Sequence, residues 1–151
     1  MIPVDNLRFK NVLANKLGVS RRSLTTLVIG EHGEGMLPLI KYSTVNGIPL
    51  NEFTTKDVLE ECYNETIGAA AKIIKLKGAT FYAPSMAIYR MLEAIKLDKN
   101  IIMPASAFLQ GEYNQEGLCI GVPTILGKNG IKKISIKNGI TYSQPFVAAQ
   151  I

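Results

Sequence analysis

The spacing of hydrophobic residues divides the chain into a largely helical part and a later part made of strands. In three stretches between residues 5 and 97, apolar side chains recur every three or four positions, which is the period of an amphipathic helix. After residue 100 they fall into short runs bounded by turn residues, as in strands. The pattern predicts helices over 5–17, from 54 or 55 to about 77 and from about 84 to 97, and strands over 101–109, 118–126 and 131–136.

Residues with strong conformational preferences mark the ends of the predicted helices. Asp5 is a good N-cap for the first helix, and Gly18 stands where a glycine commonly ends one. Gly78 follows a basic run and stops the second helix. Pro84 fits the first turn of the third helix, where its missing N–H costs nothing. The middle of the chain is therefore expected to hold two long helices with almost no linker.

Two shorter extended runs precede these helices, over 23–29 and 37–43, and Asn46-Gly47 marks a turn after them. The short turns between the later strands imply antiparallel pairing. Helices grouped in the middle and a meander at the end indicate an α+β fold, with long helices packed on an antiparallel sheet. We expect residues 1–151 to form one domain.

Composition narrows the classes of function. Apolar residues make up 47% of the chain and charged residues 19%, as in a globular protein. The net charge of +5 is mostly spread along the chain without a nucleic-acid-binding motif, so we expect no nucleic-acid partner. The sequence has no apolar run long enough to span a membrane. Cys62 and Cys119 lack metal-ligand spacing, so we expect no metal site. Both lie in apolar patterns, which predicts buried thiols in a reducing, cytoplasmic compartment.

The only histidine, His32, lies in a loop with three glycines, Gly30, Gly33 and Gly35. Glycine permits positive φ and close approach of other groups, so this loop presents the imidazole at the end of a strand. An imidazole exchanges protons near neutral pH, which makes it a candidate general acid or base. The alternative is a histidine in a tight turn whose ring is satisfied by the backbone.

Asp5 and Arg8 project from nearly the same side of the first helix because they are three residues apart. A carboxylate orients a catalytic imidazole, and a guanidinium grips a substrate carboxylate with two hydrogen bonds. With His32, these residues describe a site for a small 2-hydroxy or 2-oxo acid. Alternatively, Asp5 only caps the helix and Arg8 is a surface charge.

Several segments resemble the C-terminal, substrate-binding domain of the NAD-dependent lactate/malate dehydrogenase family. The resemblance covers nearly all of residues 4–136, with the motifs in family order. The segments that carry it are Asp5-Asn-Leu-Arg-Phe9, Val28-Ile-Gly-Glu-His-Gly-Glu-Gly-Met-Leu-Pro-Leu39, Lys77-Gly-Ala-Thr-Phe-Tyr-Ala-Pro84, Gly111-Glu-Tyr113 and Gly121-Val-Pro-Thr-Ile-Leu-Gly-Lys-Asn-Gly130.

The resemblance implies a role for each candidate residue. His32 would be the proton donor and acceptor, paired with Asp5, and Arg8 would bind the substrate carboxylate. Thr80 would line the substrate pocket, and Pro84 would lie near the nicotinamide ring. Residues 33–38 and 82–84 look more like the malate dehydrogenases that resemble lactate dehydrogenases than like lactate dehydrogenases themselves.

The family binds NAD or NADP mainly through a separate N-terminal Rossmann domain, and no glycine-rich strand–helix unit precedes Met1. We therefore expect that cofactor domain to be absent from this chain and to be one of its partners. The other implied partners are a small dicarboxylate or 2-hydroxy-acid substrate and further copies of the protein, as a dimer or tetramer. Two departures are that Glu34 replaces the family's usual aspartate and that residues 138–151 lack the pattern of the amphipathic helix that normally closes the domain.

The sequence therefore favours the catalytic half of a malate dehydrogenase that is inactive when isolated. Two alternatives stay open at this point. One is a domain of an L-lactate or other 2-hydroxy-acid dehydrogenase. The other is a non-catalytic oligomerisation or interaction module of the same fold, in which Asp5, Arg8 and His32 are relics.

Overall fold

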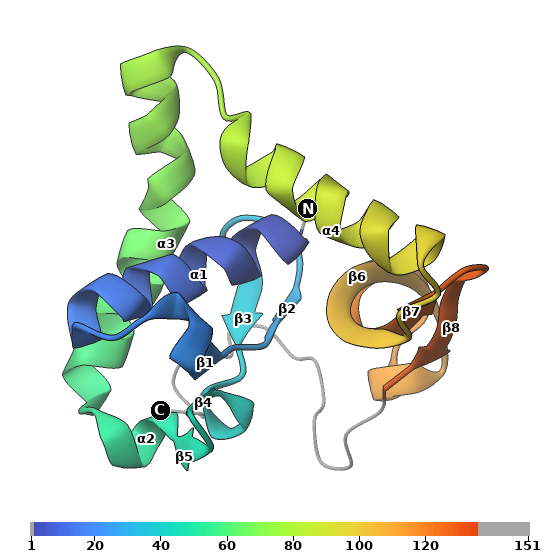
Figure 1. The fold of residues 1–151 in the computed structure, drawn as a ribbon, viewed down its shortest axis with the longest axis horizontal. Coiled ribbons are helices and arrows are strands. Elements are labelled where there is room, and N and C mark those ends of the chain that lie inside the picture. Colours follow the sequence, from blue (N-terminus) through green and yellow to red (C-terminus); the bar gives the residue numbers. More distant parts are fainter. Residues whose placement is uncertain (1, 136–151) are drawn as a thin grey trace.

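The computed structural model describes residues 2–135, and Figure 1 shows the arrangement of its elements. The helices are α1 (Ile2–Leu17), α2 (Leu50–Phe53), α3 (Lys56–Lys77) and α4 (Tyr82–Lys96). The early strands are β1 (Leu24–Thr25), β2 (Val28–Gly30), β3 (Met36–Pro38), β4 (Thr44–Val45) and β5 (Ile48–Pro49). The later strands are β6 (Ile101–Gln110), β7 (Glu116–Gly127) and β8 (Gly130–Ile134).

The strands form two antiparallel sheets. The smaller sheet has the order β1-β4-β5, and the larger has the order β3-β2-β7-β6, with β8 also paired to β7. The pairs β6–β7 and β7–β8 are the meander that the sequence predicts at the end of the chain. The expected α+β class, with long helices packed on an antiparallel sheet, is confirmed.

Strand β2 lies between two hydrophobic clusters. Val28 packs with residues of α1 and α3, including Phe9, Leu13 and Cys62. Its neighbour Ile29 belongs to a second cluster built mainly from the larger sheet. Successive side chains of a strand point to opposite faces, so β2 is buried on both sides. The segment that leads into the histidine loop is therefore fixed by packing in both directions.

Helix α1 connects the two halves of the molecule. In Figure 1 it crosses the middle of the molecule, α3 passes beside it, and α4 runs from the far end of α3 toward the meander. The buried face of α1 is formed by apolar side chains at helical spacing, including Phe9, Val12 and Leu13. Gly78 ends α3 in the left-handed conformation, with φ of 78°, as the sequence predicts.

Three predictions from the sequence are wrong in detail. Helix α1 begins at Ile2, because Pro3 suits a first helical turn, so Asp5 is an internal residue and not the N-cap. Residues 23–29 do not form one strand, because β1 pairs with β4 in the small sheet while β2 pairs with β3 and β7 in the large one. Residues 37–43 do not stay extended, because β3 ends at Pro38 and a 3₁₀ turn covers Ile40–Tyr42.

The prediction that both cysteines are buried holds for Cys62 but is wrong for Cys119, which is exposed. Cys119 lies opposite Phe108 in the β6–β7 ladder, and both side chains face solvent on the same side of the sheet. Within residues 2–135, no helix is long and apolar enough to cross a membrane. The tail over 138–151 lies outside the described residues.

Candidate active site

Asp5 and His32 form a close pair between α1 and the loop that follows β2. The Nδ1 atom of His32 lies 2.6 Å from Oδ2 of Asp5. Asp5 is almost completely buried, with 3% of its side chain exposed, whereas the imidazole is 50% exposed. An ionised carboxylate only accepts hydrogen bonds, so Nδ1–H donates to Asp5 and Nε2 is left for another group. This arrangement orients an imidazole toward solvent from a buried anchor.

The local backbone explains why His32 is presented in this way. Gly30 and Gly33 have φ of 95° and 97°, a region that side-chain-bearing residues rarely adopt. The N–H of Glu31 donates to the carbonyl of Gly35 at 3.2 Å, and the N–H of Met36 donates to the carbonyl of Gly33 at 3.1 Å. The loop therefore turns tightly between two buried strands and carries the imidazole at its tip.

Arg8 lies one helical turn beyond Asp5 and is 9% exposed. One terminal nitrogen of its guanidinium is 3.8 Å from Oδ1 of Asp5, an ion-pair distance too long for a hydrogen bond. Its Nε is buried and has no hydrogen-bond partner among residues 2–135. A buried guanidinium that is incompletely paired is costly, and an added carboxylate would supply the missing charge and acceptors. The interpretation of Arg8 as a surface charge is therefore wrong.

Thr80 and Pro84 lie at the junction between α3 and α4. Both are partly exposed, and Pro84 occupies the first turn of α4 as predicted. Thr80 does not cap this helix, because Phe81 is the N-cap residue and makes no side-chain cap. Among residues 2–135, the structure records no hydrogen bond or ion pair between Thr80 and Asp5, Arg8 or His32. The structure thus brings Asp5, Arg8 and His32 together, and leaves Thr80 and Pro84 on a separate segment.

The junction is apolar and open. Phe81 and Tyr82 are 50% and 76% exposed and pack edge to face, with ring centroids 5.8 Å apart. The ammonium group of Lys77 lies 5.0 Å from the centre of the Tyr82 ring. Exposed apolar surface of this kind is typical of interaction sites.

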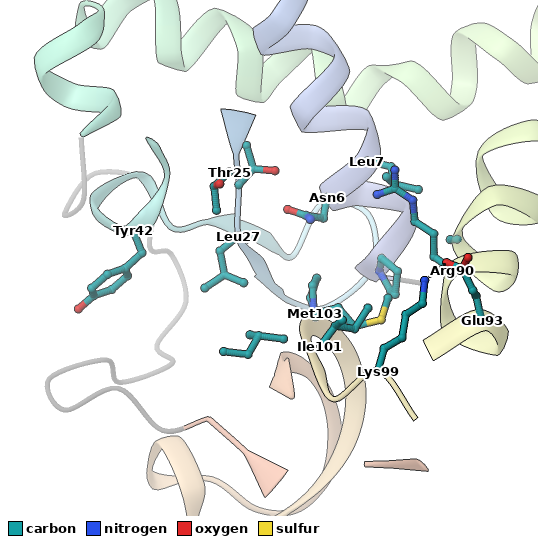
Figure 2. Close-up of a pocket in the computed structure, with 15 residues that line it drawn as sticks. Asn6, Leu7, Thr25, Leu27, Tyr42, Arg90, Glu93, Lys99, Ile101 and Met103 are labelled. Carbon is teal, nitrogen blue, oxygen red and sulfur yellow. Dashed lines mark ion pairs between the residues drawn. The ribbon is translucent and has the colours of Figure 1, made fainter. Parts of the chain in front are cut away.

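A pocket of about 620 Å³ lies on the opposite side of α1 from the Asp5–His32 pair. Its lining includes Asn6 and Leu7 of α1, Arg90 and Glu93 of α4 and the start of β6. In Figure 2, Leu7 lies beside Arg90, whereas Asn6 points toward Thr25. Each helical residue turns the side chain by about 100°, so Asn6 and Leu7 face away from Asp5 and Arg8. Glu93 is paired with Lys99 at 2.9 Å. This pocket is separate from the candidate active site.

Two further observations concern groups outside the Asp5–His32 pair. Burial, and then the charges of Arg90 and Arg21, lower the pKa of Lys10 on α1. Within residues 2–135, no group of three or more histidine, cysteine, aspartate or glutamate side chains could hold a metal ion.

Sequence reasoning missed Gly121, which lies beside both the start of α1 and the end of β2. Gly121 opens one of the motifs quoted above, and a glycine inside a strand is a recognised sign of close backbone approach. The sequence alone does not say which segments approach it.

The sequence comparison matches residues 3–142 to a family described as the lactate/malate dehydrogenase, alpha/beta C-terminal domain. The malate dehydrogenase of Methanosarcina mazei is 44% identical over 133 residues, which cover 87% of this chain and 43% of that protein. That of Geobacillus kaustophilus is 42% identical over 133 residues, with the same 87% and 43% coverage. The chain thus spans less than half the length of these relatives.

Solved structures agree with this comparison. The malate dehydrogenase of Salinibacter ruber matches with a TM-score of 0.87 and 37% identity, over 91% of this chain and 46% of that one. The lactate dehydrogenase of Eimeria maxima, solved with NADH and oxamate, matches with a TM-score of 0.85 and 34% identity, over 91% of this chain and 45% of that one. The chain therefore belongs to the family of lactate/malate dehydrogenase C-terminal domains.

Proposed function

We propose that this chain is the catalytic half of a malate dehydrogenase, which interconverts oxaloacetate and malate with a nicotinamide cofactor. The observation that carries the proposal is the 2.6 Å contact between buried Asp5 and half-exposed His32, beside the incompletely paired Arg8. An oriented acid–base group next to a cation is what proton transfer on a small carboxylic acid requires. The relatives at 42–44% identity are malate dehydrogenases, which favours malate over lactate.

In this proposal, Arg8 binds a carboxylate of the substrate through its guanidinium. His32 donates a proton from Nε2 to the C2 oxygen during reduction and removes that proton during oxidation. Asp5 holds the Nδ1–H tautomer and offsets the charge of the imidazolium when it forms. Thr80 would line the substrate pocket from the α3–α4 junction once substrate and cofactor are bound.

A bound nicotinamide would supply the hydride that goes to or from C2 of the substrate. In this proposal, Pro84 and the exposed apolar start of α4 would lie against the nicotinamide end of such a cofactor. Residues 2–135 have no glycine-rich turn between a strand and a helix to hold a pyrophosphate. We therefore assign most of the NAD or NADP binding to a separate cofactor domain, and expect this chain alone to be inactive.

The exposed apolar α3–α4 junction also supports an interaction with a cofactor domain or with further copies of the protein. We propose that the full enzyme is a homo-oligomer, a dimer or tetramer, and that the cofactor domain covers part of this surface. The two free thiols, Cys62 and Cys119, are consistent with a reducing, cytoplasmic compartment.

The test is reduction of oxaloacetate by NADH, with pyruvate measured in parallel. The assay compares this chain, the cofactor domain of the Methanosarcina mazei relative, and their mixture. Activity in the mixture only, with oxaloacetate preferred, supports the proposal. A preference for pyruvate would instead assign the lactate reaction.

Variants distinguish catalysis by this chain from mere assembly with the added domain. We expect His32→Asn to abolish the activity of the mixture, and Asp57→Asn, an exposed carboxylate on α3, to leave it unchanged. A complex that forms, shown by sedimentation, but reduces neither acid would favour the non-catalytic interaction module. An undiminished rate in His32→Asn would overturn the catalytic role of the histidine.

A further inference from the structure

Gly121 of β7 lies where the larger sheet meets both segments that carry the Asp5–His32 pair. Across the β2–β7 pairing its partner is Gly30, and across the β6–β7 ladder its partner is Ser106. A Cβ atom at Gly121 would lie 2.1 Å from Cγ1 of Ile2, 2.7 Å from Cβ of Ile2 and 2.8 Å from the carbonyl oxygen of Gly30. The site has room for a hydrogen atom and for no side chain.

The two neighbours of Gly121 lead directly to the two members of the pair. Ile2 is buried and lies one helical turn before Asp5 on α1. Gly30 is the last residue of β2, and His32 follows two positions later. A side chain at position 121 would push Ile2 and the Gly30 carbonyl away from β7. It would therefore change the separation between α1 and the histidine loop.

We propose that Gly121 is a positioning residue, whose missing side chain sets the approach of α1 and β2 and so the contact between Asp5 and His32. That contact is sensitive to small shifts, because a charge-assisted hydrogen bond of 2.6 Å weakens steeply beyond ordinary bonding distance. Two of the three crowding atoms belong to the Cβ–Cγ1 stem of a packed side chain and the third to backbone, so none moves freely. Gly121→Ala must therefore displace α1, β2 or β7. The catalytic importance of the Asp5–His32 pair rests on the proposed function, but the effect of Gly121 on the geometry of the pair does not.

The test reads the imidazole itself. His32 is the only histidine in the chain, so ¹⁵N-labelled histidine gives one pair of ring signals whose shifts report the Nδ1–H and Nε2–H tautomers. In alkaline solution we expect the wild type to favour Nδ1–H, because Asp5 accepts a hydrogen bond from Nδ1. Gly121→Ala should lower the ratio of Nδ1–H to Nε2–H by about fivefold or more, as loss of a hydrogen bond to a charged group would. Asp5→Asn gives the ratio expected without the carboxylate.

Gly127 provides a matched control on the same strand. A Cβ atom there would lie 2.6 Å from Cε of Lys132 and 2.7 Å from side-chain oxygens of Asn100 and Asp98, which are ends of flexible side chains that can move aside. None of these groups belongs to α1 or β2, so Gly127→Ala should leave the tautomer ratio unchanged. Ile2→Ala removes the nearest crowding atom and loosens the same contact, and we expect it to lower the ratio about twofold. It covers the case in which Gly121→Ala does not fold.

The outcomes separate this inference from the proposed function. The positioning role would be overturned if Gly121→Ala folds and keeps the wild-type ratio of Nδ1–H to Nε2–H. It would also be overturned if Gly127→Ala shifts the ratio equally. If Gly121→Ala does not fold, an unchanged ratio in Ile2→Ala would overturn it. A lowered ratio in a chain that never supports oxaloacetate reduction would leave the positioning role standing and remove the proposed function. Where the mixture is active, Gly121→Ala should lower kcat more than it raises KM, because the proton-transfer group is misaligned.

Discussion

The Asp5–His32 region and the α3–α4 junction differ in how completely this chain builds them. Asp5 and Arg8 are buried against a core that includes Phe9 and Leu13, and the strand leading to His32 is packed on both faces. At the junction, by contrast, Phe81 and Tyr82 expose half or more of their surfaces. The chain alone packs the first region, whereas it leaves apolar side chains of the second exposed to solvent.

This contrast matches the division of labour in a hydride transfer coupled to proton transfer. The proton-handling group must be held in register before substrate arrives, and burial of its orienting carboxylate achieves this. In the proposed function, the surface that meets the nicotinamide must be open to admit cofactor and substrate. We infer that the acid–base half of the site is preformed in this chain, while the half that excludes water is completed from outside it.

The largest expected effects concern the pair itself. In the mixture with a cofactor domain, Asp5→Asn should lower kcat on the order of 10²–10⁴-fold, because the imidazole loses its orienting carboxylate. The measurement is steady-state oxaloacetate reduction with both proteins confirmed as folded by circular dichroism. A loss smaller than about threefold would show that Asp5 merely supports the fold.

Arg8→Lys tests the substrate anchor with the charge retained. Lysine cannot reproduce the planar two-bond contact with a carboxylate, so KM for oxaloacetate should rise roughly 10–100-fold. Inhibition by a non-reactive dicarboxylate such as malonate should weaken in parallel. If KM stays unchanged while kcat falls, Arg8 acts through Asp5 and not on the substrate.

Core and junction should also respond differently to truncation. Phe9→Ala should destabilise the chain by roughly 3–5 kcal/mol, because Phe9 is completely buried. Tyr82→Ala, at a residue 76% exposed, should change the free energy of unfolding by less than about 0.5 kcal/mol. Urea denaturation followed by circular dichroism measures both. A cost above about 1 kcal/mol at Tyr82 would mean that the junction is already covered.

The smallest effect concerns the two thiols. Burial raises the pKa of Cys62 to about 11 from its ordinary value of 9.0. The thiol of the unfolded chain ionises first as pH rises, so the contribution of Cys62 to stability is constant below about pH 9 and falls between pH 9 and 11, by roughly 1–3 kcal/mol. Urea denaturation across this pH range should show a smaller fall in the free energy of unfolding for Cys62→Ala than for Cys119→Ala.

The two thiols should also differ in reactivity. In the folded chain at neutral pH, iodoacetamide should label exposed Cys119 and spare Cys62, and equal labelling would contradict the burial of Cys62.

Much of the architecture follows from local pattern in the sequence. The long helices and the meander were predictable because their periods are regular and their ends carry glycine or proline, as at Gly78 and Pro84. The short strands before α2 were not, because β1 and β2 belong to different sheets, and only tertiary pairing separates them. Cys119 was misjudged because an apolar run does not reveal which side of a strand faces solvent.

The site shows the same limit. Chemistry and resemblance paired Asp5 with His32, and the structure has this contact. The prediction that Asp5 caps α1 was wrong, because a good N-cap residue was given more weight than Pro3, which suits the first turn of a helix that begins at Ile2. The burial of Arg8 depends on packing against distant segments. Gly121 could be recognised as an unusual strand residue, but its contacts with Ile2 and Gly30 exist only in three dimensions.

The central claim is that the acid–base pair is complete in this chain before the cofactor domain binds. The most direct measurement is the ¹⁵N spectrum of His32 in the isolated chain and in the mixture with the cofactor domain, in alkaline solution without substrate. We predict that the Nδ1–H tautomer dominates in both samples, because Asp5 accepts from Nδ1 in either case. A mixed tautomer population in the isolated chain that becomes Nδ1–H only after the cofactor domain is added would contradict the claim.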